Sequence, residues 1–312
     1  MYSYTEPKMF DWMYCFNENG EINTYCCVVG SGSGVTPPTS KEPSKLYHYT
    51  SLDSFCKIVS TKKMYLTSLF NMNDTKEVIW FYRLLNSQIA QLHLSQDKIA
   101  NAVRAITRIN LQDAYSVCFT TLKDKNGKWD TYGVKHTGVC FEINPKILPI
   151  TRDLPMRDSE GSICLYTCAF LKVNYNQNIQ KKTIKDILKL AIKDKNNFFN
   201  YANYLSKVAY TCKNPSYSDE NEWRILYTPL CKNPTQKIEI LDNKEFKISS
   251  IKSHIKNGKP SQYCEIPILD GFITKVIIGS KCTATINDIK TLLNNSQYNT
   301  TEHPIIIEKS KI

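Results

Sequence analysis

From residue 46 onward, apolar residues recur either in short β-prone runs, some of them alternating, or at the three- to four-residue spacing of a helix face, and the two patterns predict strands interspersed with helices. Runs of β-prone residues predict strands at Leu46–Thr50, Lys63–Ser68, Tyr115–Thr121, Gly138–Ile143, Ile163–Val173, Glu222–Tyr227, Tyr263–Leu269, Ile273–Gly279 and Pro304–Glu308. Helical spacing predicts helices at Leu52–Ser60, from Asp74 to His93, at Ser95–Asn110, at Asn287–Leu293, and one or two within Lys181–Lys207. Because the two kinds of element alternate irregularly, with few βαβ units, the pattern favours an α+β domain.

The first 45 residues follow a different pattern. Two β-prone runs flank a turn-rich segment over residues 10–29 and predict a hairpin. Residues 30–45 are rich in Gly, Ser and Pro and predict a linker. We therefore expect an N-terminal hairpin and linker over residues 1–45 and one main α+β domain over residues 46–312.

The composition is that of a soluble globular protein, with 42% hydrophobic and 22% charged residues among 312. No apolar run is long enough to span a bilayer, and the N-terminus lacks the features of a signal peptide, so we expect a cytoplasmic protein without membrane contact. Twelve cysteines without a CxxC spacing indicate reduced thiols rather than disulfides or structural zinc. The net charge of +11 permits contact with nucleic acid or an acidic cofactor without requiring either.

The most unusual polar stretch is Ser218–Tyr227, in which two carboxylates precede a Trp and an Arg. If Glu222 begins a strand, period-2 alternation places Glu220, Glu222 and Arg224 on one face and directs Trp223 into a core. Two acids on one face repel each other, so we expect one of them to have a raised pKa. The Arg224 guanidinium can bind Glu222 through two hydrogen bonds and fix its position. An edge strand with a salt bridge explains the same residues.

Five polar clusters in all interrupt the apolar pattern. They are His48 in the first strand, Asn73-Asp74-x-x-Glu77, Trp129-x-x-Tyr132, His136 before Gly138, and Glu220-x-Glu222-x-Arg224. Each has a structural interpretation: a strand histidine is commonly structural, the second cluster is a helix cap, and aromatics one helical turn apart form a packed pair. Their occurrence together, in this order, points beyond structure.

The ordered set resembles a widespread bacterial domain family of unknown function. The resemblance covers Leu46 to Glu308 and rests on Tyr-His-Tyr-Thr at 47–50, Asn-Asp-x-x-Glu at 73–77, Cys-Phe-Thr at 118–120, Trp-x-x-Tyr-x-x-x-His-x-Gly at 129–138, Glu-x-Glu-Trp-Arg at 220–224 and Val-Ile-Ile-Gly at 276–279. Members of that family are cytoplasmic, and many lie near genes for defence against phage. The resemblance therefore implies an effector in anti-phage defence, with a partner protein from the same defence system.

That family in turn looks like a distant branch of the ADP-ribosyltransferase superfamily. This second resemblance implies a split mixed or antiparallel β-sheet with flanking helices, with NAD as substrate and a protein or nucleic-acid acceptor. It implies an enzyme that is a transferase, or an NAD glycohydrolase if water is the acceptor. The site residues that it implies are Glu222 and Glu220 as catalytic residues, and His48, Tyr49, Thr50, Tyr65, Tyr132 and Arg224 as cofactor-binding residues.

The superfamily assigns a separate role to most of these side chains. A His on the first strand holds the NAD ribose, an aromatic residue stacks on the nicotinamide, and a late Glu stabilises an oxocarbenium-like transition state. By resemblance these are His48, Tyr132 with Tyr65 as its competitor, and Glu222, while Glu220 serves the acceptor. We expect His48 and Glu222 to lie on neighbouring strands of one split sheet and to face a common pocket.

The residues here depart from the superfamily in two places. The middle strand has Thr120-Thr121 where the superfamily has Ser-Thr-Ser, and the Trp-x-x-Tyr element is not standard. The chemistry itself suits the residues, because a carboxylate in a site that excludes water strongly stabilises positive charge on a sugar. This reaction requires no metal ion, so we expect none.

Two other classes of function stay open. The net charge and the acids Asp74, Glu77, Glu220 and Glu222 suit a Mg²⁺-dependent nuclease or a nucleic-acid-binding effector. No lysine follows the Glu pair at the spacing of a common nuclease core, which ranks this class lower. The third class is a sensor module that binds a nucleotide without turnover.

Overall fold

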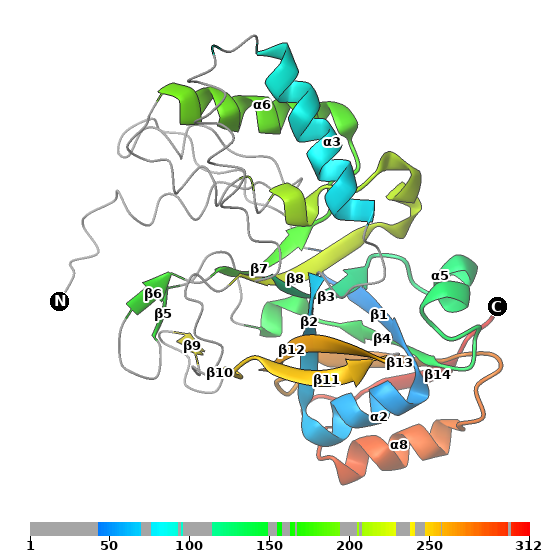
Figure 1. Ribbon diagram of the computed structural model, residues 1–312. Helices are drawn as coiled ribbons and strands as arrows, with labels where there is room; N and C mark the ends of the chain where they lie inside the picture. Colours follow the sequence, from blue (N-terminus) through cyan, green and yellow to red (C-terminus); the bar gives the residue numbers. More distant parts are fainter. Residues whose placement is uncertain are drawn as a thin grey trace.

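The computed structural model describes residues 43–69, 76–92, 95, 114–148, 155–157, 163–165, 167–193, 205, 208–228, 238–240, 247–256, 258–298 and 301–312. Over these residues the fold is α+β, as predicted, with one large mixed sheet and helices at its two ends (Figure 1). The predicted hairpin, most of the predicted linker, the Asp74 cap and nearly all of the predicted helix Ser95–Asn110 lie outside the described residues.

The large sheet contains ten strands in the order β11-β12-β2-β3-β1-β4-β13-β14, with β8 paired to β3 and β7 paired to β8. All of its pairs are antiparallel except β13–β14. Its strands are β1 Leu46–Thr50, β2 Lys63–Ser68, β3 Tyr115–Thr120, β4 Val139–Ile143, β7 Thr167–Lys172, β8 Glu222–Thr228, β11 Lys252–Lys256, β12 Lys259–Pro267, β13 Ile273–Ile278 and β14 Ile306–Lys309.

Strand β3 holds the two halves of this sheet together. At its start, Tyr115 and Ser116 lie opposite β2, whereas at its end Thr120 lies opposite Tyr47 of β1. Between these pairings β1 and β2 diverge, and the segment Val117–Phe119 faces the gap. The sheet is therefore split between β1 and β2, as the resemblance implied.

Two helices cover the face of the sheet that carries the main core, below the sheet in Figure 1. Helix α2 (Leu52–Thr61) begins at the predicted N-cap Ser51, whose hydroxyl accepts from the Ser54 amide, and buries Phe55 and Val59. Helix α8 (Ile286–Asn295) begins with a capping box between Thr285 and Asp288. Both predicted helices are confirmed.

The remaining elements lie away from that core. Helices α3 (Lys76–Gln91) and α6 (Gln177–Lys193) pack against each other at the opposite end of the molecule (Figure 1). The short helix α5 (Asn126–Thr131) covers Tyr47 and Tyr49 through Trp129. A second, four-stranded sheet and two 3-10 helices complete the described part: β5 Pro155–Arg157, β6 Ile163–Leu165, β9 Ile238–Ile240, β10 Lys247–Ile248, η3 Pro145–Ile147 and η4 Pro215–Glu220.

Two predicted strands differ from the structure by more than a residue or two, and helix α6 begins at Gln177 rather than at the predicted Lys181. The run Ile163–Val173 forms two strands, β6 in the small sheet and β7 in the large one, because its two parts pair with different partners. Strand β12 begins at Lys259, four residues before the predicted start, because its polar beginning pairs with β11 rather than covering a core. Hydrophobic periodicity reports which face of an element is buried, so it marks neither a change of partner strand nor a polar start of a strand.

The described cysteines agree with the expectation of reduced thiols. The thiols for which the structure gives a state are free: Cys56, Cys118, Cys140, Cys212, Cys264 and Cys282. Four of them are buried, where a thiol packs as a small apolar group. Within the described ranges, no helix combines the length and apolar character needed to cross a membrane.

Candidate functional site

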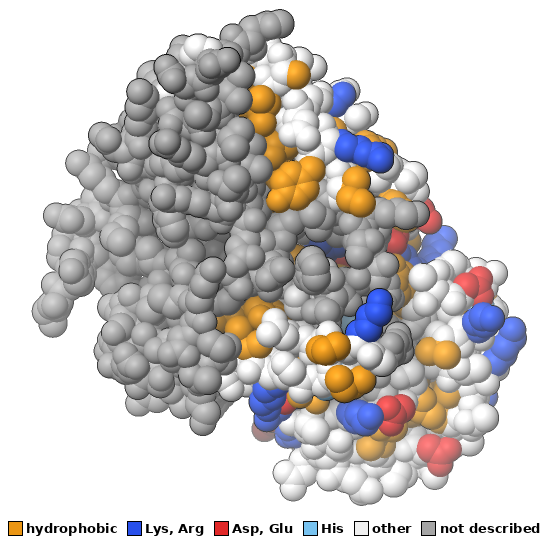
Figure 2. All heavy atoms as spheres, in the orientation of Figure 1, with side chains coloured by type: hydrophobic (Ala, Val, Ile, Leu, Met, Phe, Trp, Pro, Cys, Tyr) orange, Lys and Arg blue, Asp and Glu red, His pale blue; other side chains and the backbone are white. Residues whose placement is uncertain are grey.

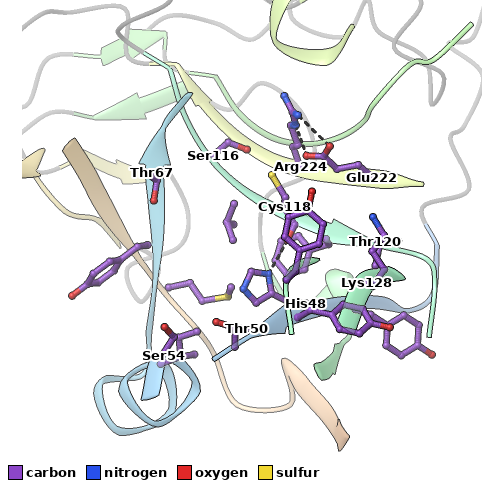
Figure 3. A pocket seen from close by; sticks show the side chains of 18 of the residues that line it. His48, Thr50, Ser54, Thr67, Ser116, Cys118, Thr120, Lys128, Glu222 and Arg224 are labelled. Atoms are coloured by element: carbon purple, nitrogen blue, oxygen red, sulfur yellow. Dashed lines mark hydrogen bonds and ion pairs between the residues drawn. The ribbon is translucent and has the colours of Figure 1, made fainter. Parts of the chain in front are cut away.

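A cavity of about 430 Å³ opens at the gap between β1 and β2, along the segment Val117–Phe119 of β3, which pairs with β8 but with neither β1 nor β2. Its volume is within the range of small-molecule sites. Figure 3 shows that side chains from β1, β2, β3, β8 and α5 converge on it. All of the predicted site residues line it: His48, Tyr49, Thr50, Tyr65, Tyr132, Glu220, Glu222 and Arg224.

His48 lies in the gap itself. Its ring Nδ1 is 2.7 Å from the carbonyl oxygen of Cys118, in the segment of β3 that neither β1 nor β2 pairs with. Because a carbonyl only accepts, Nδ1 carries the proton and Nε2 is left as an acceptor. Burial lowers the pKa of His48, and the Cys118 hydrogen bond opposes this more weakly, so the imidazole is neutral at pH 7. His48 thus lies on β1 and lines the cavity, where the sequence analysis expected a strand histidine.

The expected arrangement of His48 and Glu222 on neighbouring strands is wrong. Strand β3 lies between β1 and β8. Strand alternation places His48 beside Phe119 on the core face, whereas Glu222 lies opposite Thr120 on the other face. The two side chains still line one cavity because the split in the sheet connects its two faces at Cys118.

Glu222 begins β8 and is fully engaged by cations. The Arg224 Nε donates to Oε1 at 2.7 Å, and its second guanidinium nitrogen donates to Oε2 at 3.2 Å. The Nζ of Lys213 donates to Oε2 at 3.0 Å. Burial alone would raise the pKa of Glu222, but the charges of Arg224 and Lys213 lower it to about 2. The two-point contact with Arg224 is as predicted, and the raised pKa expected from repulsion is not found at Glu222.

Glu220 reaches the same site from a different element. It ends the 3-10 helix η4 rather than lying in the strand, because Asn221 adopts a left-handed conformation (φ 43°) between the two acids. The predicted common strand face of Glu220 and Glu222 is therefore wrong. The Glu220 carboxylate nevertheless accepts hydrogen bonds from Tyr132 Oη at 2.9 Å and from Lys213 Nζ.

Lys213 is the functional side chain that sequence reasoning missed. It is 5% exposed and its Nζ lies between the carboxylates of Glu220 and Glu222, which removes the repulsion expected between them. The sequence offers one sign of it, because Lys213 is a charged residue at the end of the mostly apolar run that starts at Val208. Its spacing of seven and nine residues from the two acids matches no helix or strand period, so only the fold shows the contact.

The tyrosines divide between the wall and the rim of the cavity. Tyr49 is buried, and its hydroxyl donates to the Leu122 carbonyl at 2.9 Å, which holds the loop before α5. Tyr132 and Tyr65 lie at the rim, 42% and 47% exposed, and Tyr65 stacks on Tyr263 with ring centroids 4.3 Å apart. Both rim rings can therefore approach a ligand, and the choice between them stays open.

Two other predicted clusters have structural roles. Trp129 is fully buried and packs edge-on against Tyr49, with ring centroids 5.0 Å apart, whereas Tyr132 turns toward Glu220. The two are therefore not a packed pair, because Tyr132 ends α5 as its C-cap. His136 is buried, and its ring stacks on the Trp129 ring with the two centroids 5.9 Å apart. It is not among the residues that line the cavity.

The described residues offer a metal ion little support. No group of three or more His, Cys, Asp or Glu side chains suited to a metal is found among them. At the Glu220–Glu222 pair, Lys213 Nζ occupies the position between the carboxylates that a cation would take. The side chains of Asp74 and Glu77 lie outside the described part.

Comparison with known proteins finds one similarity. No curated protein and no solved structure matches the chain. Residues 128–225 match the model of a family described as protein of unknown function (DUF2971), which confirms over these residues the resemblance to a domain family of unknown function. The matching segment contains the Trp129-x-x-Tyr132 and Glu220-x-Glu222-x-Arg224 elements, but not His48 or β2.

Proposed function

We propose that the cavity binds NAD and that the protein consumes it, as an ADP-ribosyltransferase or, with water as acceptor, as an NAD glycohydrolase. One observation carries this proposal. A single cavity in the split of the sheet brings together a neutral His48, an ionised Glu222 and exposed rim tyrosines, which the superfamily resemblance had selected from distant parts of the chain.

The reaction breaks the bond between the nicotinamide nitrogen and the ribose, and the electron pair leaves with the nicotinamide. Positive charge develops on the sugar, and the Glu222 carboxylate is ionised and held in place to oppose it. His48 Nε2 is free to accept a ribose hydroxyl, because Nδ1 is bound to Cys118. The oxygen of water or of an acceptor hydroxyl then bonds to the sugar carbon, and its proton passes to Glu220.

Arg224 serves this chemistry through Glu222. Its guanidinium is almost fully buried and donates to Glu222 and to the Tyr210 carbonyl at 2.7 Å. We therefore assign Arg224 to positioning Glu222 rather than to the cofactor contact that the resemblance implied. The ribose and nicotinamide contacts fall to His48, Thr50, Tyr65 and Tyr132.

The nuclease alternative receives no support from the described site. Lys213 between the two carboxylates opposes Mg²⁺ binding there. On the face shown in Figure 2, the coloured Lys and Arg side chains are interspersed with acidic and apolar ones rather than gathered into a basic patch. A role as an effector in anti-phage defence stays a prediction of the family resemblance, as does the partner protein.

Nicotinamide release tests the proposed function directly. The full chain is incubated with NAD, with and without Mg²⁺, alongside the folded Glu222→Gln variant. We expect release by the wild type that is independent of Mg²⁺ and falls by about 10²–10³ in the variant. A variant that consumes NAD at the wild-type rate would refute the assignment. Mg²⁺-dependent cleavage of DNA or RNA that Glu222→Gln abolishes would favour the nuclease instead, and tight binding of intact NAD would favour the sensor.

A further inference from the structure

Lys128 is a buried cation in the wall of the cavity that the proposed reaction does not use. It lies in α5, one turn before Tyr132, and is 8% exposed. Its Nζ is 5.2 Å from the centre of the Tyr132 ring, and Figure 3 shows it on the α5 side of the cavity.

The other cations that line the cavity each have a carboxylate partner. Lys57 pairs with Asp53, Lys63 with Glu265, and Lys213 and Arg224 with Glu222. Among the described residues, no carboxylate lies within 4.0 Å of Lys128 Nζ and no hydrogen-bond acceptor contacts it. The positive charge that remains in the cavity after pairing is thus the charge of Lys128.

The Lys128 side chain as a whole is buried, and its ammonium lies beside the Tyr132 ring in the cavity wall without a carboxylate to pair with, so the charge has lost part of its hydration. Burial lowers the pKa of Lys128, and the more distant charges of Glu220 and Glu222 act in the opposite direction. An anion that entered the cavity would supply the missing partner and restore the stability of the charged form.

A second side chain in the same cavity has a polar group without a partner. Ser116, on β3 beside β2, is 1% exposed, and its hydroxyl has no hydrogen-bond partner in the described part of the chain. It lines the cavity together with Lys128 but comes from a different wall (Figure 3). Buried polar groups are almost always hydrogen-bonded in proteins. A cation without a carboxylate partner and an unsatisfied buried hydroxyl that line one cavity indicate a ligand with an anionic group and a further polar group.

We propose that Lys128 binds a phosphate or pyrophosphate group of the ligand in this cavity, and that Ser116 bonds a second polar group of the same ligand. The identification of that ligand as NAD rests on the proposed function, whereas the anion contact does not. A lysine ammonium acts toward phosphate as a point charge that needs no fixed geometry, which suits a single side chain on a short helix.

Binding of ADP-ribose and of inorganic pyrophosphate, measured by calorimetry without any turnover, tests this contact. Lys128→Met removes the charge and keeps most of the volume. Lys125→Met is the matched control, because Lys125 is exposed, flanks the same helix and does not line the cavity. We expect Lys128→Met to weaken both probes by about 10- to 100-fold and Lys125→Met to leave them within about twofold.

Thermal unfolding of the variants separates the contact from a structural role. Removing an unpaired buried charge should leave the midpoint of Lys128→Met equal to or above that of the wild type. If this variant does not fold, Lys128→Gln replaces it. Wild-type protein that binds neither probe, or Lys128 and Lys125 variants that bind them equally, would overturn the proposal. Binding that depends on Lys128 without nicotinamide release would instead contradict only the proposed catalysis.

Discussion

Replacing Glu222 by Gln should destabilise the fold as well as slow the reaction. The carboxylate is bound by Arg224 and Lys213, and its pKa falls from 4.5 to about 2 in the folded protein. At about 1.4 kcal/mol per pKa unit, this shift corresponds to about 3 kcal/mol of folding free energy. Breaking a buried ion pair by removing one partner typically costs about 3–5 kcal/mol, which agrees with this estimate.

The pH dependence of the effect has a definite sign. Because the folded-state pKa of Glu222 is lowered, its contribution is fully present above pH 4.5 and is lost as the pH falls toward 2. The difference in unfolding free energy between wild type and Glu222→Gln should therefore shrink from about 3 kcal/mol at pH 7 to about 1 kcal/mol at pH 3. Acids that do not share a partner with Glu222 titrate alike in both proteins and cancel in this difference.

Urea denaturation at several pH values measures this difference. Glu308→Gln is the control, since Glu308 also pairs with two lysines, Lys123 at 2.9 Å and Lys275 at 3.3 Å, but its side chain is 34% exposed against 8% for Glu222. Solvent screens a partly exposed pair, so this variant should lose about 1 kcal/mol or less, clearly less than Glu222→Gln. Equal stability of Glu222→Gln and wild type at pH 7, or a difference that does not change with pH, would refute the assignment of an ionised, doubly paired Glu222.

Three further substitutions probe the other site residues. His48→Ala should weaken NAD binding as well as turnover, measured by calorimetry and nicotinamide release, since its Nε2 is the free acceptor; unchanged NAD affinity would remove it from the site. Glu220→Gln should reduce acceptor labelling while NAD hydrolysis partly survives; equal loss of both would assign Glu220 to the bond-breaking step. Tyr132→Phe keeps the ring and removes the hydroxyl that binds Glu220, which should lower the unfolding free energy by about 1 kcal/mol. Loss of NAD binding in this variant would show that the hydroxyl, not the ring, contacts the ligand.

Much of the fold follows from local patterns in the sequence. Alternation along Glu222–Tyr227 correctly predicts that Trp223 is buried and that Glu222 and Arg224 share a face, because strand geometry fixes the direction of each side chain. Ser51 correctly predicts the start of α2, because a cap satisfies amides within the same turn. Such features depend only on neighbours along the chain.

Other features depend on which strands pair, and the sequence does not carry that information locally. The run Ile163–Val173 divides between two sheets, and β3 separates β1 from β8, although no period in the sequence marks either event. Residues far apart in sequence meet when the chain between them closes into a loop, and hydrophobic periodicity, which is a local pattern, carries no information on which segments meet.

The sequence by itself determined the α+β class, the strand positions of His48 and Glu222, and the eight predicted site residues, all of which line the cavity. Only the tertiary structure placed Lys213 between Glu220 and Glu222, which turned the expected repulsion of two acids into a paired, ionised site. Only the structure placed Lys128 in the wall of the same cavity, beside the Tyr132 ring and without a carboxylate partner among the described residues. The physical reason is that a pKa or an ion pair depends on distances of a few ångströms between segments, and packing alone sets those distances.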